Sequence, residues 1–191
     1  MSAAKSNYSN KFGTSARRGD GMKAKRVALW GILSAAAIGI SALEGLFAFP
    51  FLPPGAKPGL SNSVVILAAI NSSFAGGIYI SVIKSLFALF TRGTAAFILS
   101  LAGGITSSTV TALLIKMKKC PFSLMGTGII GAIVHNGMQL LVSCLLSGTA
   151  AVLYYAPALL VFACISGALT GFIAKVTLPF TSNAFIKKEK K

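Results

Sequence analysis

Apolar runs of membrane-spanning length dominate the sequence and limit what it can fold into. They cover approximately residues 27–49, 60–78, 79–90, 94–115, 122–146 and 151–174. A helix needs roughly 20 apolar residues to cross the hydrocarbon core of a bilayer. Only 11% of the residues are charged, whereas a soluble domain carries about 25%. The pattern predicts an all-α integral membrane protein, built as a bundle of six transmembrane helices.

The second and third runs are the hardest to separate. Together they are too long for one comfortable span and short for two. The segment NSSFAGG, residues 71–77, is the break between them. We therefore expect a turn there, with a short third span, a tilted helix or a re-entrant segment on one side of it.

Basic residues gather in three places, which are residues 5–26, the stretch 116–119 and residues 175–191. The positive-inside rule assigns such clusters to the cytoplasm. Six spans put all three on one side, whereas five would separate the two ends. We expect both termini to be cytoplasmic, with a disordered basic tail over 1–26, a membrane domain over 27–175 and a basic tail over 176–191. The net charge of +15 then reflects topology, and no nucleic-acid partner is expected.

Polar residues within the spans mark candidate sites, because a charge at the centre of a membrane helix costs about 2.5–3.5 kcal/mol. The predicted substrate-binding residues are Glu44, Lys57, Asn62, Lys84, His135, Asn136 and Gln139. Glu44 has two open roles: a structural partner for Lys57 or Lys84, or a wall of a ligand cavity facing outward. Lys57 either lies in solvent or captures an anionic group. His135 and Gln139 are one turn apart and share a helix face.

Small residues repeat along the first span at four-residue spacing. Gly31, Ala35 and Gly39 form this stripe, and Gly167 and Gly171 form a GxxxG pair on the last span. Such stripes allow the backbones of two membrane helices to approach closely. The first stripe is a candidate partner interface, with packing inside the chain as the alternative.

Four segments resemble one family of small membrane proteins. They are LEGLFAFPFLPPGAKPGLSN (43–62), LSLAGGITSSTVTALLIK (99–116), GAIVHNGMQLLVS (131–143) and LYYAPALLVFACISGALTGFIA (153–174). The loop pattern PGxKxGLxN and the segment HNxxQ are the most specific pieces. The family is labelled Gx transporter or heptaprenyl diphosphate synthase component I. The resemblance covers about residues 27–175, with Lys84 where the family usually has arginine.

That family is similar, in size and span number, to the substrate-binding S-components of energy-coupling-factor (ECF) importers. The resemblance implies a six-helix subunit of a prokaryotic plasma membrane that binds a vitamin, cofactor or precursor from outside. It also implies a membrane scaffold subunit and two ATPase subunits as partners. S-components dock through a small-residue stripe on the first span, and here the stripe with Gly31, Ala35 and Gly39 could serve.

The sequence excludes several kinds of chemistry for this chain. Prenyl diphosphate synthases hold Mg²⁺ with paired aspartate-rich motifs, and the one aspartate here is Asp20, in the tail. The chain has no nucleophile with a base, no phosphate-binding loop and no cysteine–histidine metal spacing. Its one histidine cannot supply bis-histidine haem ligation. We expect a non-enzymatic binding subunit without a cofactor. The alternative is an accessory membrane subunit linked to prenyl diphosphate or quinone synthesis, or to flavin-based membrane electron transfer.

Overall fold

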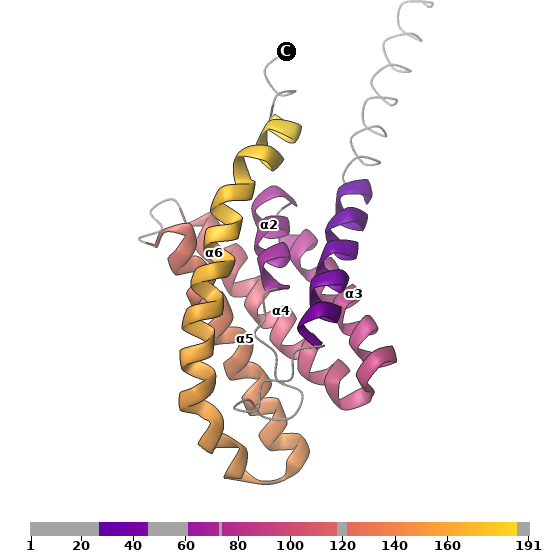
Figure 1. Ribbon diagram of the computed structural model, residues 1–191, viewed down its shortest axis with the longest axis vertical. Coiled ribbons are helices and arrows are strands. Elements are labelled where there is room, and N and C mark those ends of the chain that lie inside the picture. The colour runs from indigo at the N-terminus through magenta and orange to yellow at the C-terminus, as the bar shows by residue number, and fades with distance from the viewer. Residues whose placement is uncertain (1–26, 46–60, 73, 118–121, 187–191) are drawn as a thin grey trace, which may run out of the picture.

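The computed structural model describes residues 27–45, 61–72, 74–117 and 122–186, and these residues form helices and turns with no strand (Figure 1). An N-terminal helix (Val27–Gly45) comes first. It is followed by α2 (Asn62–Ser72), α3 (Phe74–Arg92), α4 (Thr94–Lys116), α5 (Leu124–Ser147), the 3-10 helix η1 (Ala150–Tyr155) and α6 (Ala156–Ile186). The predicted tail 1–26 and the proline-rich loop lie outside the described residues.

Local chemistry sets several of the helix ends. The side chain of Ser123 accepts a hydrogen bond from the backbone N–H of Gly126 and caps the start of α5. Gly148 ends α5 in the left-handed conformation, with φ of 64°, and its N–H donates to the carbonyl of Cys144 at 3.0 Å. Gly93, with φ of 88°, separates α3 from α4. Glycine adopts both conformations without steric cost.

Five described helices are long and apolar enough to cross a membrane, and α2 is not among them. With 11 residues, α2 is about 16 Å long, roughly half of the 30 Å hydrocarbon core. The predicted turn near residues 71–77 is confirmed, since α2 ends at Ser72 and α3 begins at Phe74. The predicted lengths were wrong: α3 has 19 residues, and the short element comes before the turn.

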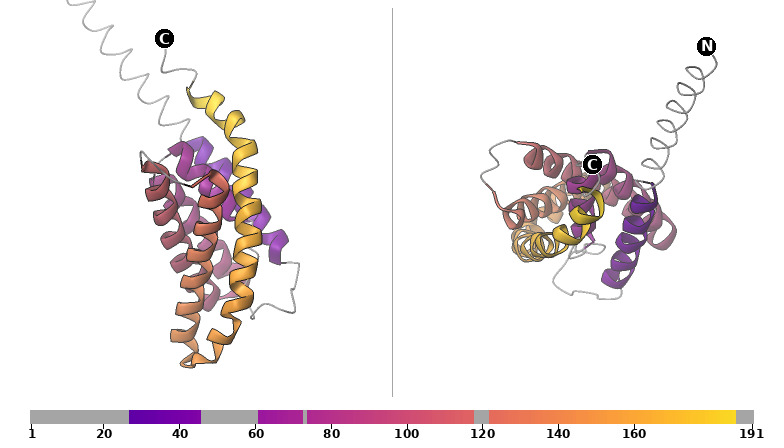
Figure 2. Two further views of the ribbon diagram at one scale, coloured as in Figure 1. Left: turned by 90° about the vertical axis from the view of Figure 1, so that its left-hand side faces the viewer. Right: turned by 90° about the horizontal axis from the view of Figure 1, so that it is seen from above.

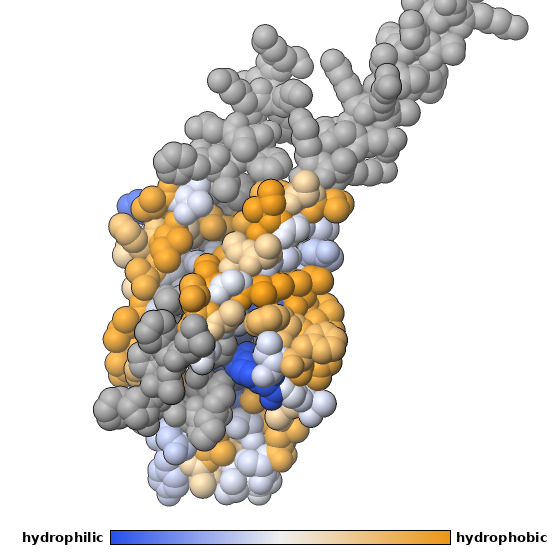
Figure 3. Space-filling model, turned by 45° about the vertical axis from the view of Figure 1, so that its right-hand side comes forward, coloured by the Kyte–Doolittle hydropathy of each residue, from blue (hydrophilic) through white to orange (hydrophobic). Residues whose placement is uncertain are grey.

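The polar and apolar residues are arranged inside out compared with a soluble protein. Side chains such as Phe90, Leu145 and Phe172 are exposed, and apolar side chains cover most of the described surface in Figure 3. The buried residues include many with hydroxyl groups, among them Ser81, Ser85, Ser100, Ser107, Ser108, Thr111, Thr127 and Thr170. Lipid solvates an apolar exterior, so this distribution fits the predicted all-α integral membrane fold.

Helices adjacent in sequence pack as antiparallel neighbours from α3 to α6, and α2 contacts α3, α4 and α6 (Figures 1 and 2). The N-terminal helix packs against α2 and α3 through a small apolar cluster. The cluster comprises Leu33, Ala37, Val64, Val65, Ala68 and Ile80. Trp30 also contacts Tyr79, with ring centroids 5.4 Å apart. The N-terminal helix and α3 thus enclose one side of the half-length helix α2.

Helices α5 and α6 approach each other closely at three glycines. A Cβ atom at Gly167 would lie 2.6 Å from the Cα of Ile129, and one at Gly171 would lie 2.5 Å from the Cα of Met125. A Cβ at Gly128 would collide with the carbonyl oxygen of Gly167. The GxxxG pair of the last span is therefore an internal contact that joins α5 to α6.

Candidate binding site in the bundle

Glu44 is the penultimate residue of the N-terminal helix, and its carboxylate points into the protein, where only 5% of the residue is exposed. Its Oε1 accepts from the backbone N–H of Ser61 at 3.3 Å, and its Oε2 accepts from the Ser61 hydroxyl at 3.2 Å. Ser61 directly precedes α2, so the carboxylate lies at the N-terminus of that helix, where the helix dipole favours a negative charge.

Lys84 meets the same serine from the other side. Its Nζ donates to the Ser61 hydroxyl at 3.2 Å and to Oδ1 of Asn62 at 2.8 Å, and only 6% of Lys84 is exposed. The Ser61 hydroxyl therefore accepts from a lysine and donates to a carboxylate. Three elements contribute to this arrangement, namely the N-terminal helix, the start of α2 and the middle of α3.

A second group of polar side chains lies on α4 and α5. The ring Nδ1 of His135 is 3.5 Å from the hydroxyl of Ser107. The ring also lies beside Gly103, where a Cβ atom would be 3.0 Å from both His135 and the Cγ of Gln139. The predicted sharing of a face by His135 and Gln139 is confirmed. Gln139 is partly buried, and its amide has no hydrogen-bond partner among the described residues.

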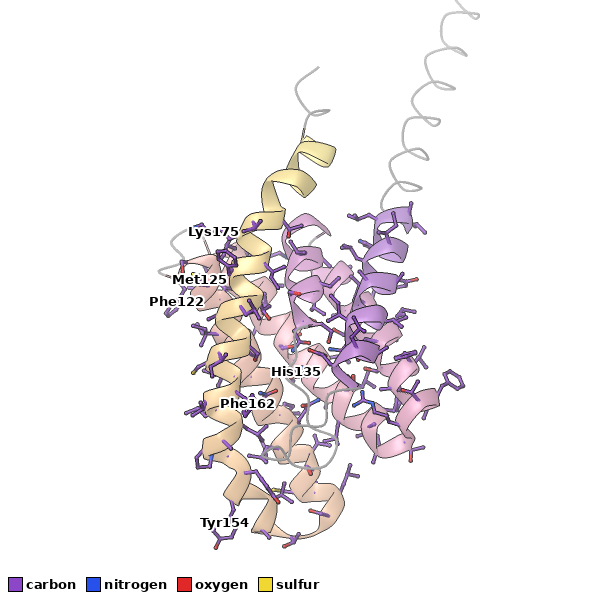
Figure 4. All side chains as sticks on the ribbon, in the orientation of Figure 1. Phe122, Met125, His135, Tyr154, Phe162 and Lys175 are labelled. Atoms are coloured by element: carbon purple, nitrogen blue, oxygen red, sulfur yellow. The ribbon has the colours of Figure 1, made fainter. Side chains whose placement is uncertain are left out.

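The two groups lie on adjacent parts of α3 and α4, because Ser81, three residues before Lys84, hydrogen-bonds to Ser108, the residue after Ser107. We call this region the central polar cluster. Its members are Glu44, Ser61, Asn62, Lys84, Ser107, His135 and Gln139. Figure 4 shows His135 near the middle of the bundle, between the end with Lys175 and the end with Tyr154. The cluster therefore lies close to mid-depth, where lipid offers polar groups no partners.

Two predicted site residues are not among the described members of this cluster. The Asn136 amide donates to the carbonyl of Leu159 at 3.5 Å, so it faces α6 and supports the α5–α6 contact. Lys57 lies outside the described residues, together with the loop that carries it. The remaining predicted residues, Glu44, Asn62 and Lys84, are brought together around Ser61.

Sequence reasoning missed the hydroxyl groups. Besides Ser61, the helices α3 and α4 are joined by pairs of serines: Ser81 with Ser108 at 2.9 Å, and Ser85 with Ser100 at 3.2 Å. The available signal was the four-residue spacing of Ser81 and Ser85 on one helix face. Hydroxyl pairs of this kind hold membrane helices together and keep the interior polar.

The small face of the N-terminal helix is not covered by any described residue. Gly31, Ala35 and Gly39 are exposed, and a Cβ atom at either glycine would meet nothing within 4 Å. Leu33 and Ala37, by contrast, pack inside the bundle. Within the described chain this stripe makes no internal packing contact, in contrast to Gly167 and Gly171.

The chemistry available in the central polar cluster is binding through charges and hydrogen bonds. It presents an ammonium group, a carboxylate, two amides, an imidazole and hydroxyls. Among the described residues no group of three His, Cys, Asp or Glu side chains gathers to hold a metal ion. Figure 3 also shows a small, strongly hydrophilic patch on a mostly apolar face.

Two comparisons with known proteins found a match, one to a family and one to a solved structure. The sequence profile of a family described as heptaprenyl diphosphate synthase component I matches residues 33–177. The structure is similar to one described as "Structure and mechanism of the S component of a bacterial ECF transporter". That similarity has a TM-score of 0.54 at 18% sequence identity, and it covers 88% of this chain and 99% of the other. No curated protein matches the chain.

Proposed function

The chain belongs to the heptaprenyl diphosphate synthase component I family, and we propose that it is a substrate-binding membrane subunit of an energy-coupling-factor type transporter. The observation that carries this proposal is the central polar cluster, buried at mid-depth in a bundle with the fold of an S component. Burying a lysine and a glutamate in a membrane is expensive, and proteins retain such groups mainly for ligands or ions. The ligand is a small vitamin, cofactor or precursor.

The likeness in fold supports the transporter proposal only together with this site, because one fold can host many functions. Glu44, Asn62 and Lys84 supply charge and orientation from one side of the site. His135 and Gln139 supply hydrogen-bonding groups from the other side. We assign the binding of the ligand to these residues, and we add Ser61 because its hydroxyl connects Glu44 to Lys84.

The exposed small face of the N-terminal helix supports a partner subunit. Gly31, Ala35 and Gly39 leave room for another helix backbone to approach, and the described chain itself does not use that room. We assign this face to a membrane scaffold subunit, which ATPase subunits would drive. The setting is the plasma membrane of a prokaryote.

The test is Gly39→Leu in the full-length protein purified from its own membrane. No described atom lies within 4 Å of a Cβ at Gly39, so the bundle should fold and keep its ligand. Recovery of the scaffold and ATPase subunits should fall sharply, while the matched control Leu43→Ala, on the same exposed side, should retain them. Native mass spectrometry reports both the associated subunits and the retained ligand. Unchanged recovery of the partners with Gly39→Leu would remove the assigned interface.

A second candidate function follows from the description of the family, which refers to heptaprenyl diphosphate synthase. In that case the chain would be an accessory membrane subunit linked to prenyl diphosphate or quinone synthesis, or to flavin-based membrane electron transfer. The same purification separates the candidates. A co-purifying prenyl synthase or a yellow flavin spectrum supports the accessory subunit, and co-purifying ATPases support the transporter.

A further inference from the structure

The central polar cluster has too few negative charges for the cations around it. The sequence holds three acidic residues, and two of them, Asp20 and Glu189, belong to the terminal segments. Glu44 is therefore the acid of the whole membrane region, including the parts that the structure does not describe. Two described cations lie on α3 near it: Lys84 reaches it through the Ser61 hydroxyl, and Arg92 is the last residue of that helix.

The hydrogen bonds that Lys84 donates to Ser61 and Asn62 go to neutral oxygens. Its ammonium donates to a serine hydroxyl and to an asparagine amide, and the carboxylate of Glu44 stands behind the serine. A hydrogen bond between two ionised groups is roughly twice as strong as one between neutral groups. Exchange of the Ser61 or Asn62 oxygen for an anionic oxygen of a ligand would therefore strengthen the contact that Lys84 makes.

Arg92 is placed to attract such an anion before it reaches Lys84. It is the last residue of α3, it is exposed, and it lies roughly 12 Å further along the helix axis than Lys84. One exposed cation at the end of α3 and one buried cation in its middle produce a field that draws negative charge inward. This arrangement of two cations would not attract a neutral or cationic ligand.

We infer that the site takes a ligand with an anionic group, a carboxylate or a phosphate, which binds Lys84 after Arg92 has attracted it. This inference deepens the proposed function and rests on it for the identity of the site. Only the charge at one end of the ligand is specified in this way. His135 and Gln139 are then left to contact the remainder of the molecule.

The test measures the thermal unfolding of the purified full-length protein at constant ionic strength. Potassium acetate and potassium phosphate are titrated as anionic probes, with acetamide as the neutral counterpart of acetate. The anions should raise the unfolding temperature in a saturable manner, and acetamide should not. In Lys84→Gln the half-saturating anion concentration should rise roughly ten- to a hundred-fold, the range expected for loss of one hydrogen bond to a charged group.

Two further variants keep the test decisive if Lys84→Gln does not fold. Arg92→Gln, at the exposed end of α3, should raise the half-saturating concentration a few-fold, and the effect should shrink as potassium chloride is added. Lys116→Gln removes an exposed cation at the opposite end of α4 and should change nothing. An equal response to acetamide, the absence of saturation with both anions, or an equal effect of Lys116→Gln and Arg92→Gln would overturn the inference. Overturning it while the scaffold and ATPases still co-purify would leave a transporter for an uncharged ligand.

Discussion

A single hydroxyl connects two buried charges, those of Glu44 and Lys84. Ser61 accepts from Lys84 and donates to Glu44, and its backbone N–H gives Glu44 a second hydrogen bond. Neither partner is exposed enough for water to replace the serine. Removal of one member of a buried polar network leaves the others unsatisfied, which costs more than the bond itself contributed.

We expect Ser61→Ala to lower the free energy of unfolding by about 1–3 kcal/mol, because both the carboxylate and the ammonium lose a buried partner. The measurement is thermal or denaturant unfolding in one detergent. Ser147→Ala is the matched control: its hydroxyl bonds a backbone carbonyl at an exposed position, so the change should stay within about 0.5 kcal/mol. Equal effects of the two variants would show that Ser61 does not bridge the charges.

Gly103 controls the position of the imidazole. A Cβ atom at this residue would lie 3.0 Å from His135 and from Gln139, closer than ordinary contact. We expect Gly103→Ala to push both side chains and to weaken ligand binding at least several-fold, with a stability cost of about 1–3 kcal/mol from overpacking. Ligand occupancy by native mass spectrometry is the readout. Gly31→Ala, on the open face, should leave occupancy unchanged, and an unchanged occupancy in Gly103→Ala would contradict the placement of His135 in the site.

Among single residues, the sequence identified only those whose burial in a membrane costs much free energy. Glu44 and Lys84 stand out because charges are expensive in a membrane, and their connection was one of the two alternatives considered for Glu44. Ser61 could not be recognised, because a serine beside a proline-rich loop carries no such cost and serines are frequent throughout the chain. The spacing of His135 and Gln139 did predict their common face. No periodicity indicated that Asn136, the intervening neighbour, turns to α6.

Among the elements, α5 and α6 form the tightest pair. Their contact depends on glycines whose missing side chains let one backbone rest against the other. Gly167→Ala should destabilise the protein by about 1–3 kcal/mol, because its Cβ would strike the backbone of Ile129, which cannot turn away as a side chain can.

Gly137→Ala on the same pair of helices is the control for glycine in a helix. A Cβ there meets nothing within 4 Å, so the change should stabilise α5 by up to about 1 kcal/mol through helix propensity. The measurement is the unfolding temperature of each variant. Gly167→Ala should lower the unfolding temperature and Gly137→Ala should raise it. A lower unfolding temperature in both variants would point to helix geometry rather than to the interhelical contact.

The ends of the helices were predictable where polar residues flank a long apolar run. The predicted run over 94–115 corresponds to α4 (Thr94–Lys116), and the run over 122–146 to α5 (Leu124–Ser147). In the run over 60–90 the turn was predicted correctly, but the short element was expected after it and not before it. Hydropathy cannot distinguish a helix that crosses the bilayer from one that reaches halfway and is buried by its neighbours. Contacts of α2 with α3, α4 and α6 stabilise it at this length.

For the molecule as a whole, the direction of the chain through the membrane is a prediction that labelling can test. The variants Val27→Cys, Lys116→Cys and Ser147→Cys, made after replacement of Cys120, Cys144 and Cys164, place single thiols at three helix ends. Membrane-impermeant reagents should label Ser147→Cys from outside. They should label Val27→Cys and Lys116→Cys only after the membrane is permeabilised, because the basic clusters next to these two positions favour the cytoplasmic side.

Labelling of Val27→Cys and Lys116→Cys from opposite sides would mean that the segment ending in α2 does not complete a crossing. The number of passes would then be odd, and the two termini would lie on opposite sides. Ser147→Cys serves as the internal control, since α5 alone separates it from the Lys116 end.

The half-length of α2 also has a consequence for how the chain is made. Consecutive helices from α3 to α6 pack as hairpins that can form as each one leaves the ribosome and enters the lipid. Helix α2 is different, because Leu67 packs on Ala174 of α6, which is synthesised long after it. During translation α2 is therefore a short polar-ended segment whose final neighbour does not yet exist. Packing around α2, whose first residue Asn62 belongs to the central polar cluster, is therefore complete only when α6 has been added.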